Sequence, residues 1–174
     1  MNTSRDGLNP PEKLSANHDV SQFQCGEPAL DNWLKRRALN NEKSGASRTY
    51  VVCAGNRVMA YYALAVGAVT HVGAPGRVRR NMPDPVPVMV IGRLAVDQAL
   101  QGQAIGPALL RDAVLRTLQA AEIAGMRAIL VHAISERAKA FYEKWGFIAS
   151  PLEPMTLMIT VAEAEKAIVG TTER

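Results

Sequence analysis

The chain has 174 residues, of which 20 are Lys or Arg and 16 are Asp or Glu, so its formal net charge is +4. This length favours one domain whose core needs no disulfide or structural metal, and a hydrophobic content of 48% excludes wholesale disorder. The longest apolar run, residues 58–69, is too short to span a bilayer, and Cys25 and Cys53 lack metal-site spacing, so we expect a reduced, cytoplasmic protein without a membrane span or a metal.

The first helix is predicted between Pro28 and about Ser44. Proline is favoured in the first turn of a helix, and glycine, here Gly45, is favoured just beyond the last turn. One apolar stripe follows the helical spacing and is formed by Leu30, Trp33, Leu34 and Ala38. The preceding residues 1–17 contain few apolar groups and are expected to be a flexible leader.

A hairpin and a third strand are predicted next. Residues 47–54 and 58–69 are rich in β-branched and apolar residues, and the Gly55-Asn56 pair between them is typical of a tight turn. Residues 71–87 contain four prolines and are expected to form a loop. Residues 88–96 are predicted to form another apolar strand.

The rest of the chain alternates helices with strands. Helices are predicted over residues 107–124 and 135–145, because a glycine follows the last turn of each. Strands are predicted over residues 127–134 and 155–161, and residues 163–174 are expected to be a polar tail. This order indicates an α/β (α+β) class with one mixed central sheet flanked by helices, and we expect the domain to cover residues 18–162.

The junction between strand 88–96 and helix 107–124 carries the main chemical signal. A strand that runs through small residues into a helix N-terminus brings unpaired N–H groups and the positive end of the helix dipole to one place, which suits a phosphate. No Gly-Lys-Ser/Thr and no GxGxxG is present, which excludes a Walker loop and a Rossmann fingerprint. A plain strand-to-helix turn is the alternative. Gly92, inside the strand, indicates a bulge or the close approach of another group.

Two motifs carry a family resemblance. The segment Gln101-Gly102-Gln103-Ala104-Ile105-Gly106 resembles the acetyl-CoA motif of the GNAT N-acetyltransferases, and Phe141-Tyr142 followed by Gly146-Phe147 resembles their second signature. The two motifs occur in the family's order, separated by a helix and a strand. The resemblance covers residues 18–161 and implies a GNAT fold with acetyl-CoA as cofactor.

Further segments resemble the acetyltransferase toxins of bacterial toxin–antitoxin systems, among them residues 23–34, 44–51 and 93–97. This resemblance implies an enzyme that acetylates the α-amino group of aminoacyl-tRNA and so blocks translation. It also implies a homodimer and neutralisation by a ribbon-helix-helix antitoxin.

The resemblance assigns roles to particular residues. The end of the strand would bind the pantetheine amides as an added strand would, and the loop would bind the pyrophosphate. The expected cofactor-binding residues are Leu94, Ala95, Val96, Gln101, Gly102, Gln103, Ala104, Ile105, Gly106 and Pro107. Tyr142 is expected to protonate the leaving thiolate as a general acid. No general base is evident, because His132 fits a structural residue better. A base is not needed if the amine is already neutral, and a free α-amino group titrates at about 8 or below.

Basic residues in two stretches are candidates for tRNA binding, because phosphate contacts need arrayed cations. The candidates are Lys35, Arg36 and Arg37 on the first helix, Arg77, Arg79 and Arg80 on the proline-rich loop, and Arg93. The alternative is that these side chains only keep a loop and a helix face soluble.

Ala104 departs from the family pattern, which has glycine at this position. A Cβ resists a positive φ and crowds an approaching pyrophosphate, so the residue is either an attenuating or a tolerated substitution. Two other functions stay open: an acetyltransferase of a small amine or a protein N-terminus, and a non-catalytic partner-binding or repressor module with a decayed CoA site.

Overall fold

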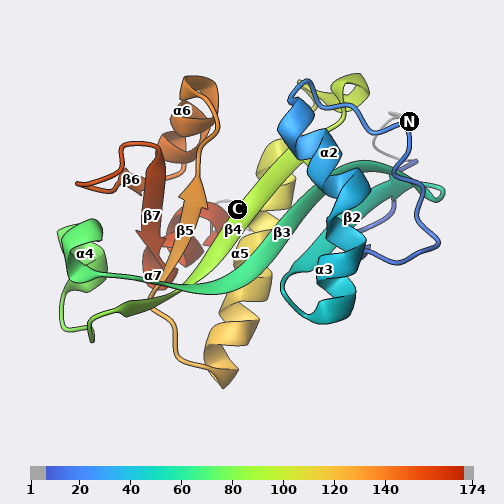
Figure 1. Cartoon of the computed structure of the whole chain (residues 1–174). Coiled ribbons are helices and arrows are strands. Elements are labelled where there is room, and N and C mark those ends of the chain that lie inside the picture. The colour runs from blue at the N-terminus through green and yellow to red at the C-terminus, as the bar shows by residue number, and fades with distance from the viewer. Residues whose placement is uncertain (1–6, 171–174) are drawn as a thin grey trace. The chain divides into compact units, whose positions relative to one another are not determined.

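The computed structural model describes residues 7–170 of the chain. Its strands form one mixed sheet in the order β1-β2-β3-β4-β5-β7-β6, flanked by helices (Figure 1). The α+β class predicted from the sequence is therefore confirmed. In chain order the elements are β1 (Glu12–Lys13), α2 (Pro28–Arg36), α3 (Ala38–Ser44), β2 (Arg48–Ala54), β3 (Arg57–Val69), η1 (His71–Gly73), α4 (Gly76–Arg79), β4 (Val86–Val96), η2 (Gln98–Leu100), α5 (Ile105–Ile123), β5 (Ala128–His132), α6 (Glu136–Lys144), β6 (Ile148–Ala149), β7 (Thr156–Thr160), α7 (Val161–Ala164) and η3 (Glu165–Val169).

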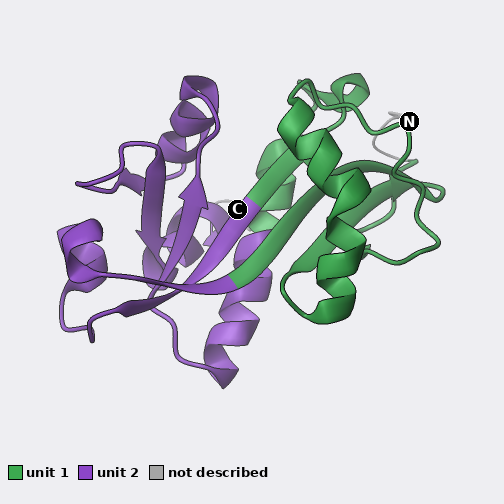
Figure 2. Cartoon of the chain, viewed as in Figure 1, with its two compact units in different colours: residues 1–65, 93–112 green, residues 66–92, 113–174 purple. Residues whose placement is uncertain are grey.

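The chain divides into two compact units, which Figure 2 colours separately. Unit 1 comprises residues 1–65 and 93–112, and unit 2 comprises residues 66–92 and 113–174. Strands β3 and β4 and helix α5 pass from one unit into the other. Neither unit is therefore a continuous stretch of sequence.

In unit 1, helices α2 and α3 replace the single helix that the sequence predicts over residues 28–44. Pro28 begins α2, and Gly45, with a φ of 80°, ends α3, as predicted. Arg37, between them, has a φ of −120° and interrupts the helix. The apolar stripe nevertheless faces the core: Leu30, Leu34 and Ala38 are buried, and the half-buried Trp33 packs against the same cluster.

The predicted hairpin is confirmed as β2 and β3, which are antiparallel with a register shift between Val52 and Cys53. Successive side chains of a strand point to opposite faces. Tyr61 faces α2 and donates a hydrogen bond of 2.7 Å to the carbonyl of Leu30. Tyr62 points the other way and donates to the Asp112 carboxylate on α5. Helix α2 and the start of α5 therefore lie on opposite faces of this hairpin.

Part of the segment predicted to be a flexible leader belongs to the sheet. Strand β1 pairs with β2 through Glu12↔Val51 and Lys13↔Tyr50, and Leu14 is only 5% exposed. The leader prediction is wrong for these residues, because it rested on the small number of apolar side chains and could not foresee the pairing with β2 or the burial of Leu14. Residues 1–6 lie outside the described part of the chain.

Unit 2 is built on β4, β5, β7 and β6. Residues Val88–Ile91 of β4 pair in parallel with Ala128–Val131 of β5, while β7 is antiparallel to both β5 and β6. Helix α6 begins at the predicted cap, where the Ser135 Oγ accepts from the Ala138 N–H at 3.1 Å, and ends before Gly146, whose φ is 97°. The buried cluster on one side of these strands contains Ala74, Val78, Val86, Val88, Ala128, Leu130 and Met158.

The C-terminal segment is also more structured than predicted. Residues 161–169 form α7 and a π-helical turn, and Ala164, Ile168 and Val169 are buried. The expected polar tail therefore does not begin at residue 163; the helical spacing of Ala164 and Ile168 was hidden among polar neighbours. Residues 171–174 lie outside the description. Over residues 7–170, no helix has the length and apolar content that a membrane crossing requires.

Candidate functional site

The parallel ladder between β4 and β5 ends at the pair Ile91↔Val131, whereas β4 continues through Gly92 to Val96. A Cβ built on Gly92 would meet nothing within 4 Å, so no packed neighbour explains this glycine. The peptide groups of Leu94–Val96 lie beyond the ladder. They suit an extended ligand chain that bonds to the strand as an added strand would.

Asp97 fixes the loop that follows β4. Its carboxylate accepts from the Ala99 N–H at 2.9 Å and from the Gln24 N–H at 3.1 Å, and the residue is only 4% exposed. The Gln98 N–H in turn donates to the Gln24 carbonyl at 2.9 Å. The loop is thus tied to the segment before α2. Sequence reasoning missed this role, although an Asp directly after a strand is a common cap for the following turn.

The side chain of Gln101 also fixes the loop that follows β4. Its Nε2 donates to the Cys25 carbonyl at 2.7 Å and to the Val96 carbonyl at 3.0 Å. Gln101 was expected among the cofactor-binding residues; its side-chain amide instead ties the loop to the end of β4 and to the Cys25 segment.

The loop then turns into α5 through two residues with positive φ, Gly102 at 83° and Ala104 at 61°. Ala104 therefore adopts the conformation that the family's glycine would allow, despite its Cβ. Helix α5 begins at Ile105, and the N–H groups of a first helical turn have no partner within the helix. Pro107 has no N–H, so this expected cofactor residue shapes the turn but cannot donate to a phosphate.

This loop fits a pyrophosphate-bearing cofactor. The donors that the helix itself leaves unused at its start include the N–H groups of Ile105 and Gly106. A Cβ on Gly102 would point into open space, which leaves room for a group to approach the backbone there. A negative charge at this point is also favoured by the dipole of a 19-residue helix.

Tyr142 lies on α6 in unit 2 and is 6% exposed. Its ring meets those of Phe141 and Phe147 edge-on, with centroid distances of 5.2 and 5.4 Å. Burial raises the pKa of Tyr142 well above its ordinary value of 10.0. The phenol therefore keeps its proton at neutral pH and can act as a donor.

His132 ends β5 and is exposed. Its Nδ1 lies 3.0 Å from the hydroxyl of Thr156 on β7. This cross-strand contact supports the interpretation of His132 as a structural residue.

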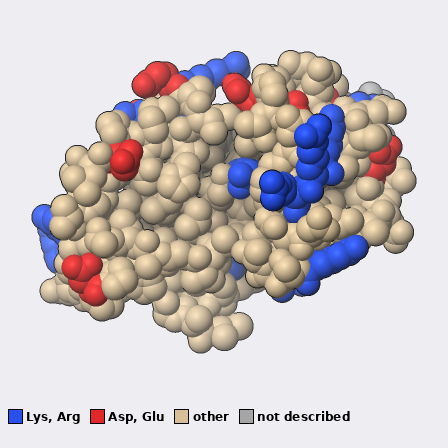
Figure 3. All heavy atoms as spheres, viewed as in Figure 1, with Lys and Arg blue, Asp and Glu red and all other residues tan. Residues whose placement is uncertain are grey.

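The basic residues expected to bind tRNA fall into two groups, one in each unit. In unit 1, Lys35, Arg36 and Arg37 are exposed, and Figure 3 shows Lys and Arg atoms gathered over α2. Arg93 joins this group, because its guanidinium lies 4.3 Å from the ring centroid of Trp33 on α2.

In unit 2, Arg77 and Arg79 lie on α4, followed by Arg80. Arg77 pairs with Glu163 at 3.0 Å, and the Arg79 Nη1 donates to the His71 carbonyl at 3.3 Å. His71 itself holds this loop, since its Nε2 lies 2.9 Å from the carbonyls of both Met82 and Pro83.

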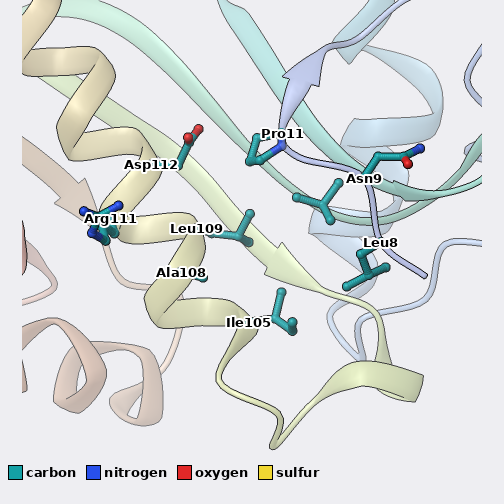
Figure 4. Close-up of a pocket in the computed structure, with 9 residues that line it drawn as sticks. Leu8, Asn9, Pro11, Ile105, Ala108, Leu109, Arg111 and Asp112 are labelled. Atoms are coloured by element: carbon teal, nitrogen blue, oxygen red, sulfur yellow. The ribbon is translucent and has the colours of Figure 1, made fainter. Parts of the chain in front are cut away.

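A pocket of about 270 Å³ in unit 1 opens between the N-terminal segment and α5 (Figure 4). Leu8, Pro11 and Leu109 give it apolar walls, and Asp112 brings a carboxylate that already accepts from Tyr62. The pocket lies on the α5 face of the hairpin, so it is separate from the residues packed under α2.

Glu12, His18 and Cys53 place three possible metal ligand atoms within 4.8 Å of one another. The Ser15 N–H donates to the His18 Nδ1 at 2.9 Å, which places the ring proton on Nε2, 2.9 Å from Glu12. Burial and the charge of Glu12 raise the pKa of Cys53 to about 11. A protonated thiol and an Nε2 that carries hydrogen suit a hydrogen-bonded cluster better than a metal site.

The fold and the loop at the start of α5 define a class of protein. The chain matches the acetyltransferase (GNAT) domain over residues 45–149. This match covers more than half of the chain, so the chain belongs to the GNAT acetyltransferase family and is an N-acetyltransferase, as the two motifs indicated.

Particular relatives narrow the comparison. The chain is 51% identical to a tRNA-acetylating toxin of Mycobacterium tuberculosis. The 164 aligned residues cover 94% of this chain and 98% of that protein. It resembles the solved structure of AtaT complexed with acetyl-methionyl-tRNAfMet, with a TM-score of 0.84, 28% identity and coverage of 91% and 97%. An AtaT variant bound to the C-terminus of the antitoxin AtaR and acetyl-CoA gives a TM-score of 0.80, 28% identity and coverage of 92% and 97%.

Proposed function

We propose that this chain is the toxin of a toxin–antitoxin pair, which transfers the acetyl group of acetyl-CoA to the α-amino group of aminoacyl-tRNA and so blocks translation. The observation that carries the proposal is the 51% identity, along nearly the whole chain, to a tRNA-acetylating toxin. The turn into α5 supports the same proposal, because its donors suit the pyrophosphate of acetyl-CoA.

Acetyl-CoA supplies the acetyl group as a thioester. In the proposed reaction, the peptide groups of Leu94–Val96 hold the pantetheine arm, and the first N–H groups of α5 hold the pyrophosphate. The amine nitrogen bonds to the acetyl carbon, the carbon–sulfur bond breaks, and Tyr142 gives its proton to the departing sulfur. The new amide nitrogen loses its proton to solvent, and the Tyr142 phenolate regains a proton from solvent. No base is required, because an α-amino group next to an ester is largely neutral near pH 8.

The proposal extends to partners and location. A homodimer in the cytoplasm, neutralised by a ribbon-helix-helix antitoxin, is what the toxin resemblance implies. The likeness to an AtaT variant bound to the C-terminus of AtaR supports an antitoxin partner. The exposed cations on α2 and α4 are the proposed contacts to tRNA phosphates.

The test is to incubate the protein with labelled acetyl-CoA and charged tRNA, and separately with deacylated tRNA, a small amine and a peptide with a free N-terminus. Label on charged tRNA alone is the expected result. Transfer mainly to the amine or the peptide would replace the proposal with the other acetyltransferase function. No transfer to any acceptor, despite bound acetyl-CoA, would overturn it.

A further inference from the structure

Three planar groups lie together on the α2 face of unit 1. The Trp33 indole is nearly parallel to the Tyr61 ring, at 10° and with a centroid distance of 6.0 Å. The Arg93 guanidinium lies 4.3 Å from the Trp33 ring centroid. Trp33, Tyr61 and Arg93 are called the α2 stack below.

The base of the α2 stack is fixed in place. Tyr61 is fully buried, donates to the Leu30 carbonyl at 2.7 Å and meets Phe23 edge-on at 5.4 Å. Helix α2 is itself held at its start, where the Asp31 carboxylate accepts from the Cys25 N–H at 2.9 Å. The stack is therefore preorganised and would lose little entropy on binding a planar ligand.

The two outer members of the stack, Trp33 and Arg93, are partly accessible, and Arg93 carries a positive charge. Trp33 and Arg93 are only half-buried, and this partial burial lowers the pKa of the Arg93 guanidinium below its usual value. Arg93 is also next to Leu94 in β4, the first residue proposed to hold pantetheine, and Lys35–Arg37 follow Trp33 along α2.

We propose that the α2 stack binds an unpaired nucleobase of the substrate's single-stranded 3′ end, so that Arg93 recognises a base and not only a phosphate. The inference rests on the proposed function. Unpaired RNA bases stack on aromatic rings and on Arg guanidinium planes, and such stacking tolerates any base because each has a π face. The neighbouring cations would hold the backbone that leads to it.

The first test is spectroscopic and needs no acetyl transfer. The chain has two tryptophans, so Trp145→Phe leaves Trp33 as the only one. This change should cost little, because the Trp145 Nε1 has no hydrogen-bond partner within residues 7–170. A single-stranded CCA ribonucleotide should quench Trp33 fluorescence, and an abasic residue at one position should abolish the quenching. The matched control, Trp33→Phe, should show none.

The second test separates a base from a phosphate contact. Arg93→Lys keeps the charge but loses the planar group. If Arg93 stacks on a base, both Arg93→Lys and Arg93→Ala should raise the KM for aminoacyl-tRNA about 5- to 150-fold and leave the KM for acetyl-CoA unchanged. If Lys restores the parental KM, the contact is to phosphate and the inference is wrong.

The two proposals fail in different ways. A protein that acetylates charged tRNA, but in which CCA does not quench Trp33, overturns the α2 stack alone. A protein that acetylates no tRNA, but in which CCA quenches Trp33, keeps the base-binding site and overturns the proposed function. If only the melting temperature responds to Trp33→Phe and Arg93→Lys, the stack does no more than pack α2 on the sheet, and the inference is wrong.

Discussion

Ala104 shows how one side chain can tune the loop that precedes α5. Its φ of 61° lies in the left-handed region, where a Cβ costs roughly 1–2 kcal/mol. We predict that Ala104→Gly raises the free energy of unfolding by about 0.5–1 kcal/mol and tightens acetyl-CoA binding. Urea unfolding and calorimetric titration measure the two effects.

The matched control for this prediction lies four residues further on. Ala108→Gly, in the first turns of α5, should lower the free energy of unfolding by about 1 kcal/mol. Equal acetyl-CoA affinities for the parent and Ala104→Gly would reject attenuation and mark alanine as a tolerated residue.

Tyr142 makes a prediction about pH. Burial raises its pKa above 10.0, so the stability that comes from the neutral phenol is complete below pH 10 and is lost as the pH rises through the folded value. The rate should rise with the neutral fraction of the amine and stay level up to about pH 10. Tyr142→Phe should lower kcat roughly 10²- to 10⁴-fold and should reduce the loss of thermal stability above pH 10.

The role of Tyr142 as proton donor can be tested against a control variant. Tyr62→Phe removes a hydroxyl that donates to Asp112, so it should lower stability but not kcat. A parental rate in Tyr142→Phe would exclude Tyr142 as the proton donor.

At the scale of the elements, the loop between β4 and α5 depends on Asp97. Asp97→Ala leaves the N–H groups of Ala99 and Gln24 without their acceptor. The free energy of unfolding should therefore fall by about 2–3 kcal/mol, and the KM for acetyl-CoA should rise. Asp97→Asn keeps one acceptor oxygen, so its free energy of unfolding and its KM for acetyl-CoA should lie between those of the parent protein and those of Asp97→Ala. An unchanged KM in Asp97→Ala would show that this clamp does not shape the cofactor site.

The elements differ in how far the sequence predicts them. The hairpin around Gly55, the ends of α6 at Ser135 and Gly146, and the start of α2 at Pro28 follow from local chemistry, and the structure confirms them. The pairing of β1 with β2 depends on tertiary contacts, and nothing in the local sequence marks the break at Arg37. Local sequence patterns do not predict such long-range features.

The candidate site, too, could be predicted from the sequence only in part. The motif identified the loop, but its bracing by Asp97 and Gln101 uses the segment around Gln24 and Cys25, about 75 residues earlier in the chain. Arg93 was predicted as a cation, while its place over Trp33 needed the fold.

At the scale of the whole molecule, the net charge of +4 matters through its placement. Lys35, Arg36 and Arg37 are exposed, and each phosphate contact contributes roughly one unit to the salt dependence of binding. Their triple replacement by Gln should lower the slope of log K against log salt by about 2–3, as measured by filter binding to tRNA.

Arg77→Gln should lower that slope by less than about one, the share of a single free cation, because Arg77 already pairs with Glu163. Lys166→Gln, an exposed cation on η3 outside both groups, is the control and should not change it. Equal slopes for all the variants would mean that these side chains only solvate the surface.

The most direct test of the central claim is where the acetyl group goes. Charged tRNA is incubated with labelled acetyl-CoA and the protein, the ester is then cleaved with mild alkali, and the released amino acid is analysed by mass spectrometry. We predict an N-acetylated amino acid with the parent protein and almost none with Tyr142→Phe. Label that stays on the tRNA, or that appears only on protein, would contradict the proposed function.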